Sequence, residues 1–247
     1  MSWMLWLLGK PDTAAERIEA ALRRADAIGH PHTKAYAYYY ASVLYALRGQ
    51  ADVAKAHAER CMSLSEAHGF RQWHGISRAV RGICQVAIDP SSGELDEVKA
   101  ALEEYRNSGY QLGITALYVL LCPVLLSLGQ HEMAMDSIDR GLSIAGVNAE
   151  RIFESELYRL KAQALRQSGT PAALKEASAA LDRALHVARQ QQAKSLELRI
   201  LRDLAQIGAS EGKRDEVKKP LASVCEWFKE GDETQDLRQA KALLAEL

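Results

Sequence analysis

The chain contains little proline and lacks the alternation of apolar and polar residues that marks a half-buried β-strand. Only six prolines occur in 247 residues, and proline is the residue that most often interrupts a helix, because it removes a backbone hydrogen bond. Long stretches such as TAAERIEAALRRADAIG (13–29) carry apolar residues at helical spacing instead. These features predict an all-α fold.

Neither sign of charge is in excess. Thirty-one Lys and Arg face 32 Asp and Glu, a formal net charge of −1, and no long block of one sign occurs. Surfaces that bind nucleic acid or anionic membranes normally need a basic excess. We therefore expect no nucleic-acid partner.

The cysteines and the N-terminus indicate the compartment. The four cysteines, Cys61, Cys84, Cys122 and Cys225, lie far apart and form no Cys-x-x-Cys pair, so we expect reduced thiols that serve as small packing residues. The N-terminal MSWMLWLLGK has no basic residue before its short apolar run, unlike a signal peptide. A cytoplasmic location is predicted.

One long uncharged run raises the alternative of a membrane protein. The segment LGITALYVLLCPVLLSLG covers residues 112–129. As a helix its length would be about 27 Å, short for a bilayer core of about 30 Å. We interpret the segment as a central helix packed on both sides, with a kink at Pro123 that opens toward a groove.

Glycines recur with a period of about forty residues. Gly29, Gly69 and Gly109 are spaced by 40, and a second set falls near multiples of the same number: Gly9, Gly49, Gly129, Gly169 and Gly212. Glycine commonly ends a helix. Two interleaved sets therefore predict two turns per repeat, that is, helical hairpins.

Small residues stand at fixed distances from the second glycine set. Seven positions before it are Ser42, Cys122, Ala162 and Ala205, and five positions after it are Ala14, Ala54 and Ala134, with the larger Val217 at the corresponding position after Gly212. With three residues inserted after Gly169, Ala177 joins the second group. Small side chains let two helices approach closely. The order of small residues and glycine resembles the tetratricopeptide repeat (TPR), in a form with longer helices.

These patterns predict one TPR-like α-α superhelix of about six hairpins with 40-residue repeats and a C-terminal capping helix. The chain is predicted to form a single solenoid domain, 1–247. The expected hairpins cover about 1–28, 32–68, 71–108, 111–146, 150–190 and 194–229, and the cap covers 234–246.

Residues 193–247 carry the marks of a bacterial family. The marks are Ala193–Arg199, Gly212–Arg214, Trp227 and Phe228 followed by Glu230 and Gly231, and Asp236 and Leu237 with Ala240–Leu244. This segment resembles the C-terminal TPR-like region of multidomain adenylate or guanylate cyclases, or transcriptional regulators, that contain a STAND-type ATPase domain. The resemblance implies a sensing or scaffolding role, and it carries over neither cyclase nor ATPase activity, because neither domain is present in this sequence.

Two segments resemble known phosphate-binding or zinc-binding motifs but lack residues that those motifs require. The segment GASEGKR (208–214) lacks the spacing and the Ser or Thr of a phosphate loop, and HEMAM (131–135) has Met135 where a zinc protease needs its second histidine. The histidines His30, His32, His57, His68 and His74 fall mostly at expected helix ends or solvent-facing turns. We therefore expect no enzyme, no cofactor and no metal.

The first helices of the hairpins are expected to line a concave groove that binds a protein or peptide partner. Its predicted residues are Tyr36, Tyr39, Val43, Leu47, Ile76, Ile83, Val119, Leu126, Arg159, Arg166, Arg199 and Arg202. Tyrosine offers a large contact area and arginine binds carboxylates through two hydrogen bonds. The groove is thus predicted to take a peptide or helix with an apolar part and an acidic part. In the alternative, the protein itself covers the apolar part and pairs the arginines.

The predicted function is a non-enzymatic interaction or scaffold module at the regulatory end of a bacterial signalling protein. The alternative is a sensor domain that binds a small molecule or signalling peptide and controls a cyclase, ATPase or transcription effector. A separate expectation concerns Trp3, Leu5, Trp6 and Leu7. Their truncated helix has no preceding repeat to cover it, which predicts a homo-oligomer through this edge.

Overall fold

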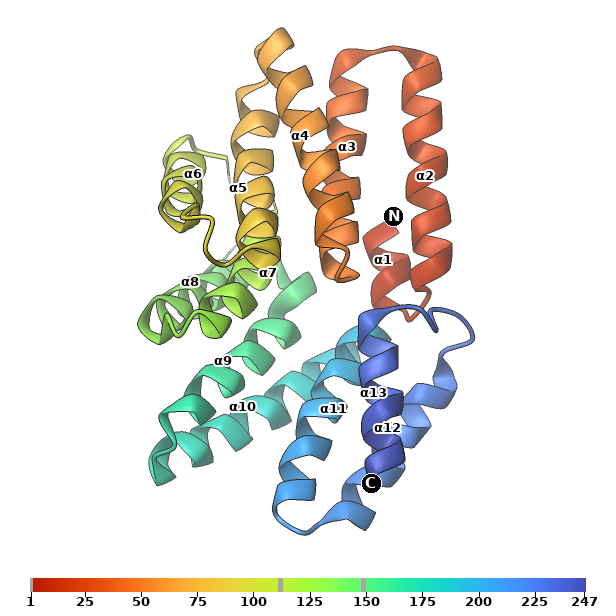
Figure 1. Ribbon diagram of the computed structural model, residues 1–247, viewed down its shortest axis with the longest axis vertical. Coiled ribbons are helices and arrows are strands. Elements are labelled where there is room, and N and C mark those ends of the chain that lie inside the picture. Colours follow the sequence, from red (N-terminus) through yellow and green to blue (C-terminus); the bar gives the residue numbers. More distant parts are fainter. Residues whose placement is uncertain (1, 111–112, 148–149) are drawn as a thin grey trace. The chain divides into compact units, whose positions relative to one another are not determined.

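A computed structural model of the chain describes residues 2–110, 113–147 and 150–247 (Figure 1). These residues are mainly helical and include no strand, which confirms the all-α prediction. Thirteen α-helices follow one another in tandem over the described ranges. They are α1 (Ser2–Leu7), α2 (Pro11–Ile28), α3 (Pro31–Leu47), α4 (Ala51–His68), α5 (Arg71–Ile88), α6 (Leu95–Asn107), α7 (Ile114–Ser127), α8 (His131–Val147), α9 (Glu154–Ser168), α10 (Pro171–Gln190), α11 (Lys194–Ser210), α12 (Arg214–Trp227) and α13 (Gln235–Glu246), with a 3-10 helix at Arg151–Phe153 before α9.

The chain forms two compact units. Ala14–Gly129, with Ser2, forms the α2–α7 unit, and Trp3–Thr13 with Gln130–Leu247 forms the α8–α13 unit. Most of α1 therefore belongs to the unit built from the other end of the sequence. The order of helices follows the predicted hairpins, whereas the division into two units has no counterpart in the repeat pattern.

Glycines end the helices, as the 40-residue spacing predicts. Gly69 has φ +70°, and its N–H donates to the carbonyl of Glu66. The N–H of Phe70 donates to the carbonyl of Ser65 at 2.8 Å, so two carbonyls at the end of α4 are satisfied. Glycine reaches this left-handed conformation without steric cost. The same positive φ occurs at Gly9, Gly29, Gly49, Gly109, Gly129, Gly169 and Gly212.

The predicted small residues are buried. Ser42, Cys122, Ala162 and Ala205 on the first helices of the hairpins have no exposed surface, and neither do Ala54 and Ala134 on the second helices. Helices α3 and α4, and likewise α9 and α10, pack against each other along their lengths (Figure 1). Close packing of this kind is what the column of small residues requires.

Helices α5 and α6 use a different pair of sizes. Gly82 of α5 stands where the other hairpins have serine, cysteine or alanine, and Val98 is the facing residue on α6. A Cβ placed on Gly82 would lie 2.6 Å from Cγ2 of Val98, well inside van der Waals contact. The smaller residue on one helix therefore accommodates the larger residue on the other.

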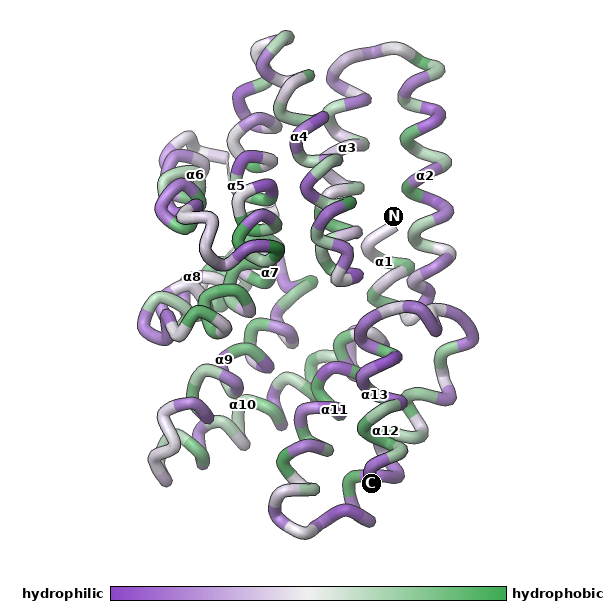
Figure 2. The backbone as a smooth tube through the Cα atoms, in the orientation of Figure 1, coloured by the Kyte–Doolittle hydropathy of each residue, from purple (hydrophilic) through white to green (hydrophobic). Residues whose placement is uncertain are grey.

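The uncharged run forms α7, a helix of 14 residues and hence about 21 Å long. Leu112, at the start of the run, lies outside the described residues. Figure 2 colours α7 mainly as hydrophobic, whereas hydrophilic and hydrophobic residues alternate along α2. The helix continues through Pro123, which is exposed. Over the described residues, no helix has both the length and the apolar character needed to cross a membrane.

Candidate functional site

Two of the predicted groove arginines lie in a buried ion network of the α8–α13 unit. Arg159 donates from Nε and Nη2 to the two carboxylate oxygens of Glu156, at 2.8 and 2.9 Å, and from Nη1 to Asp203 at 2.7 Å. Arg199 donates to Glu156 at 3.0 Å and to Asp236 at 2.9 Å. The network joins α9, α11 and α13.

The charges of this network are paired with one another inside the protein. Burial alone would raise the pKa of the Glu156 carboxyl, but the charges of Arg159 and Arg199 outweigh it and hold that pKa at about 2. The same carboxylate, with Asp203, raises the pKa of Arg159 despite its burial. The prediction that Arg159 and Arg199 face a partner is therefore wrong, because intramolecular acids use their donors.

The other two predicted arginines differ from each other. Arg202 donates to the side chain of Gln239 at 2.6 Å and also lies 3.4 Å from Asp203, so internal groups occupy it as well. Arg166 is exposed, and within the described residues its guanidinium has no hydrogen-bond or ion-pair partner. Of the predicted arginines, Arg166 is the one available to a ligand.

The predicted apolar half of the groove is closed. Seven of its eight residues are buried, namely Tyr39, Val43, Leu47, Ile76, Ile83, Val119 and Leu126. Within the α2–α7 unit, α3 packs against both α5 and α7, and α5 also packs against α7. The first helices thus converge on one another and do not line an open surface, which corrects the prediction for these residues.

Tyr36, the eighth residue, is 47% exposed. Its ring lies 5.5 Å from Trp73 in an edge-on arrangement and 4.5 Å from Tyr40, measured between ring centroids. The indole N–H of Trp73 donates to Nε2 of His32 at 2.9 Å. Tyr36 therefore lies at the edge of an aromatic cluster of the α2–α7 unit.

The truncated N-terminal helix is covered. Trp6 is 2% exposed and Trp3 and Leu7 are also buried, whereas Leu5 is half-buried. The guanidinium of Arg199 lies 5.0 Å from the Trp6 ring centroid, and the Ser195 hydroxyl donates to the Trp6 carbonyl. The expectation of an uncovered edge is wrong, because residues from the far end of the sequence supply the missing neighbour.

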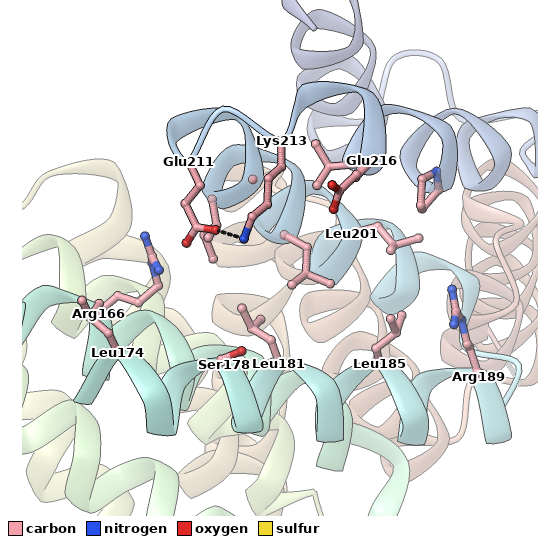
Figure 3. A pocket seen from close by; sticks show the side chains of 15 residues that line it. Arg166, Leu174, Ser178, Leu181, Leu185, Arg189, Leu201, Glu211, Lys213 and Glu216 are labelled. Atoms are coloured by element: carbon pink, nitrogen blue, oxygen red, sulfur yellow. Dashed lines mark hydrogen bonds and ion pairs between the residues drawn. The ribbon is translucent and has the colours of Figure 1, made fainter. Parts of the chain in front are cut away.

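An open cleft lies between α10, α11 and α12 in the α8–α13 unit, with a volume of about 600 Å³. Figure 3 shows Leu174, Ser178, Leu181 and Leu185 along α10 on one side, with Arg166 and Arg189 at opposite ends. Leu201, Leu204, Ile207 and Gly208 of α11 contribute to its lining, as do Val217 and Pro220 of α12. The lining is thus mainly apolar, with polar groups at its margins.

Glycine shapes one wall of the cleft. A Cβ on Gly208 would overlap the side chain of Val217, so glycine at this position allows the first turn of α12 to lie directly on α11. Leu204, Ile207 and Val217 remain half-buried. All three line the cleft.

Charges at the margins are partly paired. Lys213 donates to Glu211 at 2.7 Å, a contact that lowers the pKa of Glu211, and the charge of Arg166 lowers it further. At the other end, Arg189 and Lys194 both donate to Glu197, at 2.9 and 2.7 Å. Their charges and hydrogen bonds lower the pKa of this carboxyl although its burial acts in the opposite direction.

Of the residues that line this cleft, Arg166 alone is among the predicted partner-binding residues. The predicted residues lie on α3, α5, α7, α9 and α11, whereas the cleft draws largely on α10 and α12. One pattern could have found it: Leu174, Ser178, Leu181 and Leu185 follow 4-3-4 spacing, typical of a helix face that packs against another helix.

The cysteines and histidines provide structural groups. All four cysteines are free and buried, as predicted, and burial raises the pKa of the Cys84 thiol to about 12. His57 is buried and stacks on Tyr45, and this burial lowers its pKa. Among the residues described, no group of three or more His, Cys, Asp or Glu is arranged to hold a metal ion.

No protein-family model matches the chain, and a search of curated proteins finds no match.

Proposed function

We propose that the protein is a non-enzymatic interaction module on a TPR-like array of helical hairpins. The tandem order of helices, the glycine turns and the buried small residues support the repeat interpretation. The resemblance of residues 193–247 supports a role for such a module as the sensing or scaffolding end of a bacterial signalling protein. The free, buried cysteines are compatible with the proposed cytoplasmic location.

The observation that carries the proposal is the cleft between α10, α11 and α12. It is open, and its apolar lining includes Leu174, which is 39% exposed, and the half-buried Leu185. Exposed apolar surface bordered by polar groups is typical of a site that binds another molecule. We therefore assign the binding surface to this cleft and not to the predicted inner groove.

A second candidate is a sensor of small molecules. The cleft volume of about 600 Å³ falls within the range of about 300–1,000 Å³ usual for ligand pockets. A ligand held there would contact α10, α11 and α12 together. Such a contact offers a route to an attached cyclase, ATPase or transcription effector.

Affinity capture from a bacterial extract, quantified by mass spectrometry, tests the proposed function. The immobilised wild-type chain should retain a reproducible partner set that an empty matrix does not. Thermal-shift screening of metabolites with the same protein tests the sensor alternative. If the chain retains no protein but a small molecule stabilises it, the result favours the sensor function over the interaction function.

A further inference from the structure

We infer that the cleft between α10, α11 and α12 receives an amphipathic helix of about four turns with acidic residues at both ends. The inference rests on the proposed function and specifies its partner. Three features of the cleft argue for it: the spacing of its apolar residues, the room at its centre and the charges at its two ends.

The spacing of the lining residues favours a helix as the occupant. Leu174, Ser178, Leu181 and Leu185 follow 4-3-4 spacing along α10, and Leu201, Leu204, Gly208 and Glu211 follow 3-4-3 spacing along α11. Heptad spacing of this kind presents a continuous seam into which the side chains of another helix fit. Leu181 and Leu201 are already buried within the protein. A helix lying in the cleft would contact the more exposed members of both seams, namely Leu174, Ser178 and Leu185 on α10 and Leu204 on α11.

The centre of the cleft has room for such side chains. Ser178 is exposed and small, and it stands in the α10 seam between Leu174 and Leu181. Gly208 holds the equivalent central place in the α11 seam, where the side chain of Val217 lies directly against it. An apolar side chain of the partner would therefore fit over Ser178, against the half-buried Leu204 and Ile207.

The length follows from α10. The lining residues on this helix extend from Leu174 to Arg189, fifteen positions apart, which corresponds to about 22 Å or four helical turns. Arg166 and Arg189 lie at opposite ends of the cleft in Figure 3. A helix that spans the cleft would thus place its two ends beside these arginines.

Both ends of the cleft attract acids. Arg166 has no ion-pair partner among the described residues. At the far end, Arg189 and Lys194 share the single carboxylate of Glu197, which leaves a positive charge in excess. Acidic side chains in the first and last turns of the partner complement these charges. Glu216 lines the wall between the ends and disfavours an acid at the middle of the partner.

The test uses the full chain and two labelled peptides of about sixteen residues, both acetylated and amidated, with leucines at heptad spacing. One peptide carries glutamates in its end turns, and the other carries lysines at the same positions. Fluorescence anisotropy measures binding. We expect the glutamate peptide to bind at least about tenfold more tightly than the lysine peptide, with the difference shrinking as salt is added.

Two variants place the peptide in the cleft. Ser178→Trp fills the centre and is expected to abolish binding of the glutamate peptide, and Arg166→Glu is expected to weaken it about tenfold or more. Both positions are exposed, so folding should be preserved. The matched controls are Ser63→Trp and Arg23→Glu, which make the same changes at exposed positions on α4 and α2 and should bind like wild type.

The possible outcomes distinguish a failure of the helix inference from a failure of the proposed function. Undiminished binding to Ser178→Trp, or equal binding of the two peptides, overturns the inference. If neither peptide binds but the wild-type chain still captures partners from an extract, the inference fails and the proposed function stands. If a small molecule binds the wild type, Ser178→Trp blocks it and both peptides fail, the cleft serves a small ligand and the helix inference is again overturned.

Discussion

Glu230 caps the N-terminus of α2 across almost the whole sequence. Its Oε1 accepts hydrogen bonds from the backbone N–H of Thr13, 217 positions away, at 2.8 Å and from that of Asp12 at 3.0 Å. Its Oε2 accepts from the Thr13 hydroxyl at 2.7 Å, and Asp12 in return accepts from the backbone N–H of Gly231 at 2.8 Å. Side chains satisfy free N–H groups at a helix start in the same way when they are local. Here the cap also attaches α1 and the start of α2 to the C-terminal region.

Removal of this cap should destabilise the protein. Glu230→Ala leaves the N–H groups of Asp12 and Thr13 without their acceptor, and we expect a loss of about 1–2 kcal/mol. Urea denaturation measures the loss, and hydrogen exchange should speed up at these two amides. Glu233→Ala, in the same loop and mostly exposed, is the control and should leave both unchanged. Unaltered exchange in Glu230→Ala would show that the cap does not hold α2.

Trp6 should be the main anchor of α1. Trp6→Ala removes a ring that is 2% exposed, and we expect a cost of about 3–5 kcal/mol. Because the surface that covers α1 would then be open, the variant should also self-associate, as measured by light scattering. Trp227→Ala, at a ring 55% exposed, is the control and should cost about 1 kcal/mol or less. A stable, monomeric Trp6→Ala would contradict the anchoring role.

Gly82 and Val98 should be energetically coupled. Gly82→Ala forces a Cβ into the Val98 side chain, and overpacking of this kind costs about 1–3 kcal/mol. Val98→Ala alone leaves a small cavity. The double variant places alanine on both helices, as with Ala162 and Ala177 of α9 and α10, and should be more stable than the sum of the single changes implies. A double-mutant cycle with urea denaturation measures this coupling. If the two single free-energy changes add up to that of the double variant, the two residues are not coupled through this contact.

Glu156 should make stability depend on acid pH. Its pKa is about 2 in the folded chain against an ordinary value of 4.5. A lowered folded pKa means that the stabilisation is complete above pH 4.5 and is lost as the pH falls from there toward 2. The urea midpoint should therefore drop across this window. Glu156→Gln should be about 3–5 kcal/mol less stable at neutral pH, with a flatter dependence in the acid range. An equally steep drop in this variant would assign the effect to other carboxyls.

Local features of the fold were predictable because short-range chemistry determines them. The turn at Gly69 depends on one residue that adopts positive φ, and its neighbours in sequence supply the hydrogen bonds. The burial of Ser42 and Cys122 follows from their fixed distance to a turn glycine.

The candidate site was less predictable, because exposure depends on which helices converge. Leu126 and Arg159 stand at positions assigned to an open inner face, yet both are buried. Arg166 was identified, but with the wrong neighbours, since the residues that line its cleft come mainly from α10, α11 and α12. Helical periodicity says which residues share a face and not what lies opposite that face.

The sequence by itself therefore determined the all-α class, the order of the helices and their glycine ends, because these depend on residues within a few positions of one another. Only the tertiary structure decided that Glu230 caps α2, that Trp6 lies under Arg199, and that Glu156 and Asp203 neutralise Arg159. Most of these pairs are far apart in sequence. No local pattern encodes them. They form because a buried unpaired charge and an exposed tryptophan each cost more free energy than the loss of conformational entropy that pairs the charge or covers the ring.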